Sequence, residues 1–132
     1  MTSTVDLLDA IHTHLAAFEL PAFASVHVAT PIPGEEGITV QLRGHDLPEI
    51  ASALLSWADT LTAVTAHAWR VPSGHSVHLS ITGQLSRGAR IRVYGAMPFT
   101  GCGLGADLAP DATTTILLAA LRHVPALRGV TA

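Results

Sequence analysis

The sequence predicts a single α+β domain spanning residues 1–132, built on one antiparallel sheet of about five strands with helices packed on one face, in the order α-β-β-α-β-β-β-α. Three runs, at 64–71, 75–83 and 89–97, alternate apolar and polar side chains with period two, as antiparallel strands with one covered face do. Each connector between these runs holds a glycine where a three-residue hairpin loop takes a left-handed residue. Apolar residues at helical spacing lie before, between and after the strand groups, and such helices bury their apolar sides against a sheet.

The two connectors fix the register of this three-strand meander. If each forms the three-residue loop, Val71 pairs with His75 and Leu85 pairs with Ala89, so odd-numbered residues share one face. We expect the covered face to hold His67, Trp69, Val71, Val77, Leu79, Ile81, Ile91, Val93 and Met97. We expect the solvated face to hold Ala66, Ala68, Arg70, Ser76, His78, Ser80, Thr82, Gln84, Arg90, Arg92 and Tyr94.

The first third of the chain predicts a helix followed by two strands. Ser3 or Thr4 can cap the helix, and Pro21 ends it. The segments at 22–30 and 38–42 alternate as strands do, and the loop between them is rich in residues that break regular structure. The apolar stripe of the helix is expected to consist of Val5, Leu8, Ile11, Leu15 and Phe18.

Two further helices frame the meander. Asp46 and Glu49 form a capping-box pattern at the start of the second helix. The segment 98–110 has no periodic signal, which is typical of a functional or flexible loop. We expect Asp111 to cap the last helix and Pro125 to stop it.

Composition narrows the class of protein. In a chain of 132 residues, 48% are hydrophobic and only 13% are charged, about half the usual charged share. Such a weakly charged surface favours coverage by a partner protein or by a second copy, a homo-oligomer. The net charge of −3 argues against a general binder of nucleic acid or acidic membranes, because their affinity depends on excess positive charge.

The cellular location is predicted from cysteine usage and from the apolar runs. A single cysteine excludes an internal disulfide and suits a reducing compartment. The N-terminal residues have no basic segment before an apolar run, so we expect no signal peptide. No window approaches the roughly 18 uninterrupted apolar residues of a membrane span. We therefore expect a cytoplasmic protein that does not bind membranes.

Two patterns near the C-terminal loop suggest chemistry. Gly101, Gly103 and Gly105 match the spacing of a dinucleotide-binding loop, yet Pro110 interrupts the pattern and no strand is expected after the last helix, so we expect no cofactor. Cys102 would serve as an enzyme nucleophile only if a nearby base activated its thiol, and no catalytic cysteine motif surrounds it.

The eight histidines do not form a metal-binding pattern. His12 and His14 are two residues apart on a helix and therefore point in different directions. His75 and His78 are three apart on a strand, which places them on opposite faces. We therefore expect no metal site.

The solvated face of the meander is the leading candidate for a binding site. Three of the arginines lie within six residues on or beside it, near hydroxyl groups and an aromatic ring, which suits an acidic partner. The candidate residues are His78, Ser80, Arg87, Arg90, Arg92 and Tyr94. Because we expect this face to be flat, we interpret the chain as a non-enzymatic protein-binding or assembly module that can self-associate. The alternatives are nucleic-acid binding through the same arginines and tyrosine, and an enzyme with Cys102 as its nucleophile.

Overall fold

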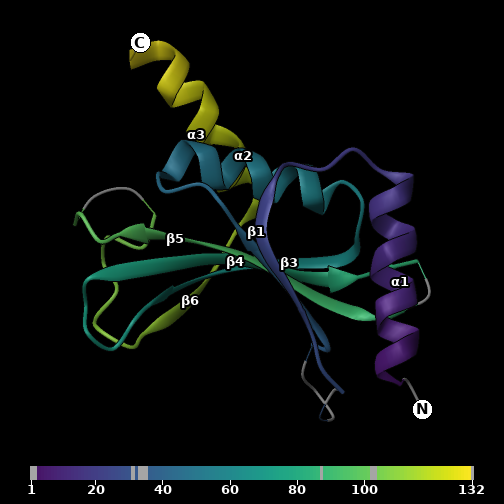
Figure 1. Ribbon diagram of the computed structural model, residues 1–132. Coiled ribbons are helices and arrows are strands. Elements are labelled where there is room, and N and C mark those ends of the chain that lie inside the picture. The colour runs from purple at the N-terminus through teal and green to yellow at the C-terminus, as the bar shows by residue number, and fades with distance from the viewer. Residues whose placement is uncertain (1–2, 31, 33–35, 87, 102–103, 132) are drawn as a thin grey trace.

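The computed structural model describes residues 3–30, 32, 36–86, 88–101 and 104–131, with side chains as far as residue 124. Its elements are α1 (Thr4–Ala17), β1 (Phe23–Val28), β2 (Ile38–Leu42), α2 (Leu47–Ala58), β3 (Thr62–Arg70), β4 (Ser76–Gln84), β5 (Arg90–Pro98), β6 (Thr113–Ile116) and α3 (Leu118–Thr131). The predicted α+β class is confirmed, and the predicted order of elements is found with one strand, β6, added before the last helix (Figure 1).

The sheet is mixed and has six strands in the order β1-β2-β5-β4-β3-β6. The prediction of about five antiparallel strands is therefore wrong. The β1–β2 hairpin and the β3–β4–β5 meander are each antiparallel, but they join through a parallel pair, with Ile38 opposite Ile91 and Val40 opposite Val93. All four of these side chains are fully buried, as expected for strands at the centre of a sheet.

The first hairpin of the meander has a longer loop than predicted. Val71 was expected to pair with His75, but the ladder ends with Arg70 opposite Val77. The Val71 N–H donates to the carbonyl of Ser76 at 3.0 Å, so four residues lie between these two partners.

Because of this extra loop residue, each side chain of β3 lies on the face opposite to the one predicted. Ala66 and Ala68 lie in the core, whereas His67 and Trp69 are half-buried on the opposite face. The prediction that His67 and Trp69 are covered by helices is wrong, because a register shift of one residue moves every side chain of a strand to the other face.

The second hairpin forms as predicted. The Leu85 N–H donates to the Ala89 carbonyl at 2.9 Å, and the Gly88 N–H donates to the Leu85 carbonyl at 2.8 Å. Consequently Leu79 and Val93 are fully buried on the covered face. The positions of β4 and β5 that were predicted to be solvated lie together on the other face, in the cross-strand pairs His78–Ala96, Ser80–Tyr94, Thr82–Arg92 and Gln84–Arg90. The prediction is wrong for the exposure of Ser80, which lies on this face but is buried beneath the neighbouring side chains.

Strand β6 occupies residues that were expected to begin the last helix. Asp111 does not cap a helix: it has a φ of 66°, and its N–H donates to the Arg70 carbonyl at 2.8 Å. Three consecutive threonines follow in β6, and their β-branched side chains favour a strand. Helix α3 then continues through Pro125, because a proline removes one backbone hydrogen bond without necessarily ending a helix whose preceding turn, with Leu121, is packed in the core.

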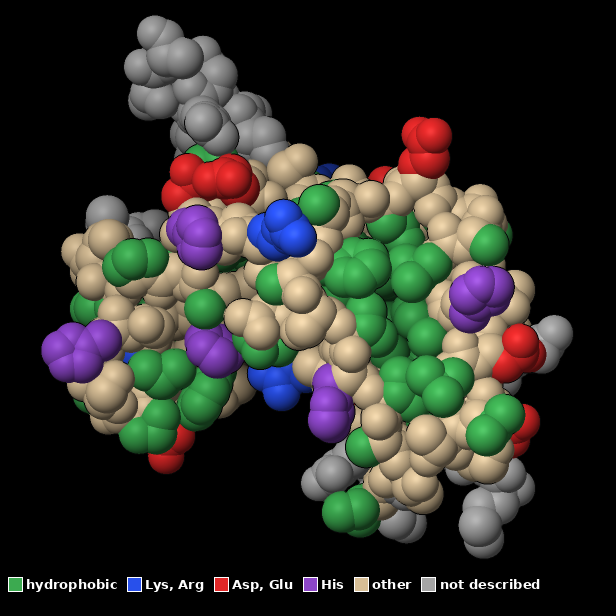
Figure 2. Space-filling view, in the orientation of Figure 1, with side chains coloured by type: hydrophobic (Ala, Val, Ile, Leu, Met, Phe, Trp, Pro, Cys, Tyr) green, Lys and Arg blue, Asp and Glu red, His purple; other side chains and the backbone are tan. Residues whose placement is uncertain are grey.

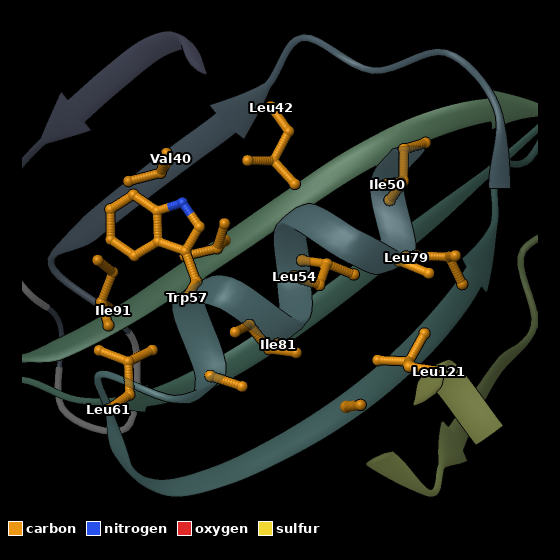
Figure 3. Packing of buried hydrophobic residues seen from close by; sticks show 14 of the residues in the cluster. Val40, Leu42, Ile50, Leu54, Trp57, Leu61, Leu79, Ile81, Ile91 and Leu121 are labelled. Carbon is orange, nitrogen blue, oxygen red and sulfur yellow. The ribbon is translucent and has the colours of Figure 1, made fainter. Parts of the chain in front are cut away.

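The core lies between the sheet and the helices (Figure 3). Asp46 caps α2 as predicted, since its Oδ1 accepts from the Glu49 N–H at 2.9 Å. Figure 3 shows the side chains of Ile50, Leu54 and Trp57 on α2 directed among the buried residues of the sheet. Helix α2 contacts β4 and β5, and α3 contacts α2. In the part of the chain that the structure describes, these helices lie on one side of β4 and β5, and no helix covers the opposite side (Figure 1).

Helix α1 is capped by Ser3, as predicted, but it buries a different stripe. Its buried residues are Leu7, Ile11 and His14, whereas Val5 is 73% exposed and Leu8 is 50% exposed. The helix is therefore rotated about its axis relative to the prediction, and a histidine occupies a core position. None of the helices in the described ranges is long and apolar enough to cross a membrane.

Candidate functional site on the open sheet face

The sheet face opposite α2, here called the open face, is lined by polar and aromatic side chains. Cross-strand pairing places Thr39, Arg92, Thr82 and Thr65 in one row, and Gln41, Tyr94, Ser80, His67 and Thr115 in the next. A third row joins His78 to Trp69 and Thr113. The face therefore combines hydroxyl groups, imidazoles and aromatic rings with the guanidinium group of Arg92.

The open face is hollowed, not flat as we expected. A hollow of about 390 Å³ lies on it, lined by Glu36, His67, Trp69, Ser80, Thr82, Arg92 and Thr113. Figure 2 shows a concave margin on the side away from α2, with basic and histidine side chains beside it. This volume falls within the range of roughly 300–1,000 Å³ that is typical of ligand pockets. We call it the first hollow.

Arg92 has an unusual position in the wall of the first hollow. Its side chain is half-buried, and its Nε is buried without a hydrogen-bond partner among the described residues. The guanidinium carbon lies 5.9 Å from the centre of the Tyr94 ring, within the range of a cation–π contact. Because the side chain of Arg92 lines the hollow, its positive charge favours an anionic group there. The planar guanidinium group matches the two oxygens of a carboxylate.

Three rings pack together beside Arg92. The His78 ring stacks on the Tyr94 ring, with 5.1 Å between the ring centroids. The His78 and Trp69 rings meet edge to face, with 5.2 Å between their centroids. Burial, and secondarily the positive charge of Arg92, lower the pKa of His78, so its ring is neutral at pH 7. The Trp69 Nε1–H donates to Asp111 Oδ1 at 3.1 Å, which fixes the indole in place. Arg92 is therefore the cation of this cluster at neutral pH.

Most of the predicted site residues come together. His78, Ser80, Arg92 and Tyr94 lie side by side on β4 and β5. Arg90 lies on the same face of β5, at its exposed first residue. Arg87 lies outside the described residues, as does Cys102, the predicted nucleophile of the enzyme alternative.

The predicted site residues did not include five residues that line the first hollow, namely Glu36, His67, Trp69, Thr82 and Thr113. His67 and Trp69 were missed because they were assigned to the covered face. The register of the first hairpin was predicted from its turn residues, and the predicted loop was one residue shorter than the loop in the structure. A second signal was present in β3 itself, where Thr65 and His67 alternate with Ala66 and Ala68. The polarity of these residues alone points to the face on which the structure places them.

Metal ligation has no support in the described part of the chain, where no three histidine, cysteine, aspartate or glutamate residues are grouped closely enough to hold an ion. Comparison of the chain with protein-family models, with curated proteins and with solved structures finds no match.

Proposed function

We propose that the chain is a non-enzymatic binding module whose open face holds a partner protein through an acidic group of that partner. The observation that carries this proposal is the guanidinium-bearing side chain of Arg92, which lines the first hollow. A carboxylate in the hollow would neutralise the charge of Arg92, and hydrogen bonds to charged groups are about twice as strong as neutral ones.

Several features of the hollow favour binding over catalysis. Ser80 is only 4% exposed, and none of the described hydrogen bonds joins its hydroxyl to an imidazole that could activate it. Trp69 and His67 present rigid surfaces with few rotatable bonds, which suits recognition of a partner at low entropic cost.

Charge favours a protein partner over nucleic acid. Strand β5 places Arg90 and Arg92 on the open face, and the chain carries a net charge of −3. Nucleic-acid affinity grows with the number of phosphates that are neutralised, so two cations on a negatively charged chain support it poorly. One or two carboxylates match the same two cations.

The test is a titration with a peptide that carries one acid, acetyl-Gly-Glu-Thr-Gln-Gly-amide, followed by ¹⁵N NMR of the Arg92 Nε–H and the Trp69 Nε1–H. We expect both signals to shift, and we expect the Arg92→Gln variant to lose about tenfold or more in affinity, because a charged hydrogen bond contributes about 1.5–3 kcal/mol. Arg43→Gln is the matched control, since the Arg43 Nε–H donates to the Phe23 carbonyl on the β1–β2 hairpin. Equal binding of a peptide with Gln in place of Glu, or full affinity of the Arg92→Gln variant, would overturn the proposal.

A further inference from the structure

A second hollow adjoins the first on the open face. It has a volume of about 250 Å³ and is lined by Ala63, Thr65, Thr82, Gly83, Gln84 and Arg90. Thr82 lines both hollows, so they meet at this residue. Each hollow has one arginine in its wall: Arg92 in the first and Arg90 in the second.

The second hollow exists because the β3–β4 ladder is interrupted beside it. The register shifts between Thr62 and Thr65, which leaves Ala63 and Val64 outside the pairing with β4. Ala63 has a φ of 54°, a left-handed conformation that residues other than glycine rarely adopt. Bulges and strained residues of this kind are concentrated beside binding and catalytic sites. The interruption therefore opens space at the point where Arg90 is placed.

The two arginines are spaced like alternate residues of an extended peptide. Arg90 and Arg92 are two positions apart on β5, opposite Gln84 and Thr82. Strand geometry therefore separates their Cα atoms by about 6.6–6.8 Å on one face. In an extended peptide, side chains at positions n and n+2 repeat with the same spacing and also share one side.

We propose that the two hollows form one groove for an extended acidic segment of a partner protein, with a carboxylate at position n bound by Arg92 and a second at n+2 bound by Arg90. This inference rests on the proposed function and adds the spacing of the acidic groups. Glu36 also lines the first hollow, and its carboxylate would repel additional acidic groups of a ligand there. The groove thus favours two acids at the correct spacing over a dense acidic run.

The test compares three peptides by NMR titration of the full chain: the single-acid peptide acetyl-Gly-Glu-Thr-Gln-Gly-amide, the spaced double-acid peptide acetyl-Gly-Glu-Thr-Glu-Gly-amide, and the adjacent double-acid peptide acetyl-Gly-Glu-Glu-Thr-Gly-amide. We expect the spaced peptide to bind about three- to fivefold tighter than the other two, because an exposed ion pair adds a modest increment. Arg90→Gln should abolish this preference, and it should weaken binding of the single-acid peptide less than Arg92→Gln does. Arg92→Gln should weaken binding of all three peptides.

The outcomes separate this inference from the function on which it rests. If the single-acid peptide binds through Arg92 but the spaced peptide gains nothing, or if Arg90→Gln leaves its advantage intact, the groove is wrong and the proposed function stands. If no peptide binds, both the proposed function and the proposed groove are wrong. If a short thymidine oligonucleotide binds tighter than any peptide, and both arginine variants weaken it, the partner is a nucleic acid and both proposals are overturned.

Discussion

His14 is a histidine in the hydrophobic core, and its contacts show that one of its ring nitrogens carries a proton. Its Nε2 lies 2.8 Å from the Thr60 hydroxyl oxygen, and the same hydroxyl donates to the Trp57 carbonyl at 2.7 Å. Because the Thr60 proton is used in that second bond, the His14 Nε2–H is the donor to the Thr60 oxygen. The ring also stacks on Trp57 at 5.9 Å between centroids and contacts Phe18 at 4.8 Å.

This arrangement predicts that the protein loses stability in mild acid. Burial lowers the pKa of His14 in the folded state, whereas the unfolded chain keeps the ordinary value of about 6.5. The unfolded state therefore binds more protons as pH falls below about 6.5, and the free energy of unfolding decreases until the folded pKa is passed. Urea unfolding at pH 7 and pH 5 should show this decrease.

The His14→Gln variant is the control for this prediction, because its amide can still donate to Thr60 but does not titrate. We expect it to be about 1–2 kcal/mol less stable at pH 7 through lost ring packing, yet less sensitive to pH than the parent chain. His78 also has a pKa lowered by burial and by Arg92, so part of the pH dependence should remain in the variant. A pH response unchanged by the substitution would show that His14 is not its source.

At the scale of elements, local turn chemistry predicts one hairpin of the meander correctly and the other incorrectly. Both connectors contain a left-handed glycine, Gly74 with a φ of 80° and Gly88 with a φ of 86°. In each connector, the glycine N–H donates to the carbonyl of the residue three positions earlier at 2.8 Å, and this hydrogen bond closes the turn. The Leu85 N–H pairs with the carbonyl of Ala89, directly after Gly88, whereas the Val71 N–H skips His75 and pairs with the carbonyl of Ser76. The turn type was therefore predictable, but the point at which pairing resumes was not.

The same distinction explains which parts of the site were foreseen. His78, Ser80, Arg92 and Tyr94 follow from the β4–β5 register, which a short local loop fixes. The hollow itself depends on partners from β3, β6 and the residues before β2, which are distant in sequence. The parallel pairing of β2 with β5 is equally non-local, and no periodic pattern within either strand specifies its neighbour. Concavity of the open face could not be derived from alternation alone.

The contact between α2 and β5 supplies a prediction about stability. Gly95 is buried on β5 directly beneath α2, and a Cβ placed on it would lie 2.9 Å from both Cγ atoms of Ile50. Gly95→Ala should therefore force α2 away from the sheet and reduce the free energy of unfolding by about 1–3 kcal/mol, the usual cost of overpacking. Chemical denaturation measures this change.

Ile50→Ala provides the matched test, because it removes both Cγ atoms that the new methyl group would meet. Alone it should cost about 2–5 kcal/mol. Combined with Gly95→Ala, it should cost less than the sum of the two single changes, since the sites are in direct contact. Strict additivity would show that the helix does not press on Gly95.

At the scale of the whole molecule, two surfaces could join copies of this chain. The open face is concave and holds the arginines, whereas α1 exposes Val5 and Leu8. Figure 2 shows apolar side chains gathered between β1 and α1. With a charged share of 13%, the chain has little like-charge repulsion to keep copies apart. The question is which surface is used.

We predict self-association through the open face, because Arg92 lines a hollow there and a carboxylate of a second copy would neutralise its charge. Sedimentation at micromolar concentration should show a dimer or larger assembly that buries more than roughly 1,000 Å² in total. Thr115→Glu, at an exposed position on β6, should weaken association, since it introduces a carboxylate that would be desolvated in the contact. Leu8→Glu on the exposed side of α1 should leave the association unchanged.

Because an acidic peptide and a second copy would occupy the same face, the spaced double-acid peptide should dissociate the assembly, and Arg92→Gln should abolish that competition. Dissociation by Leu8→Glu instead would assign the contact to α1, and a strict monomer would leave the open face free for another partner.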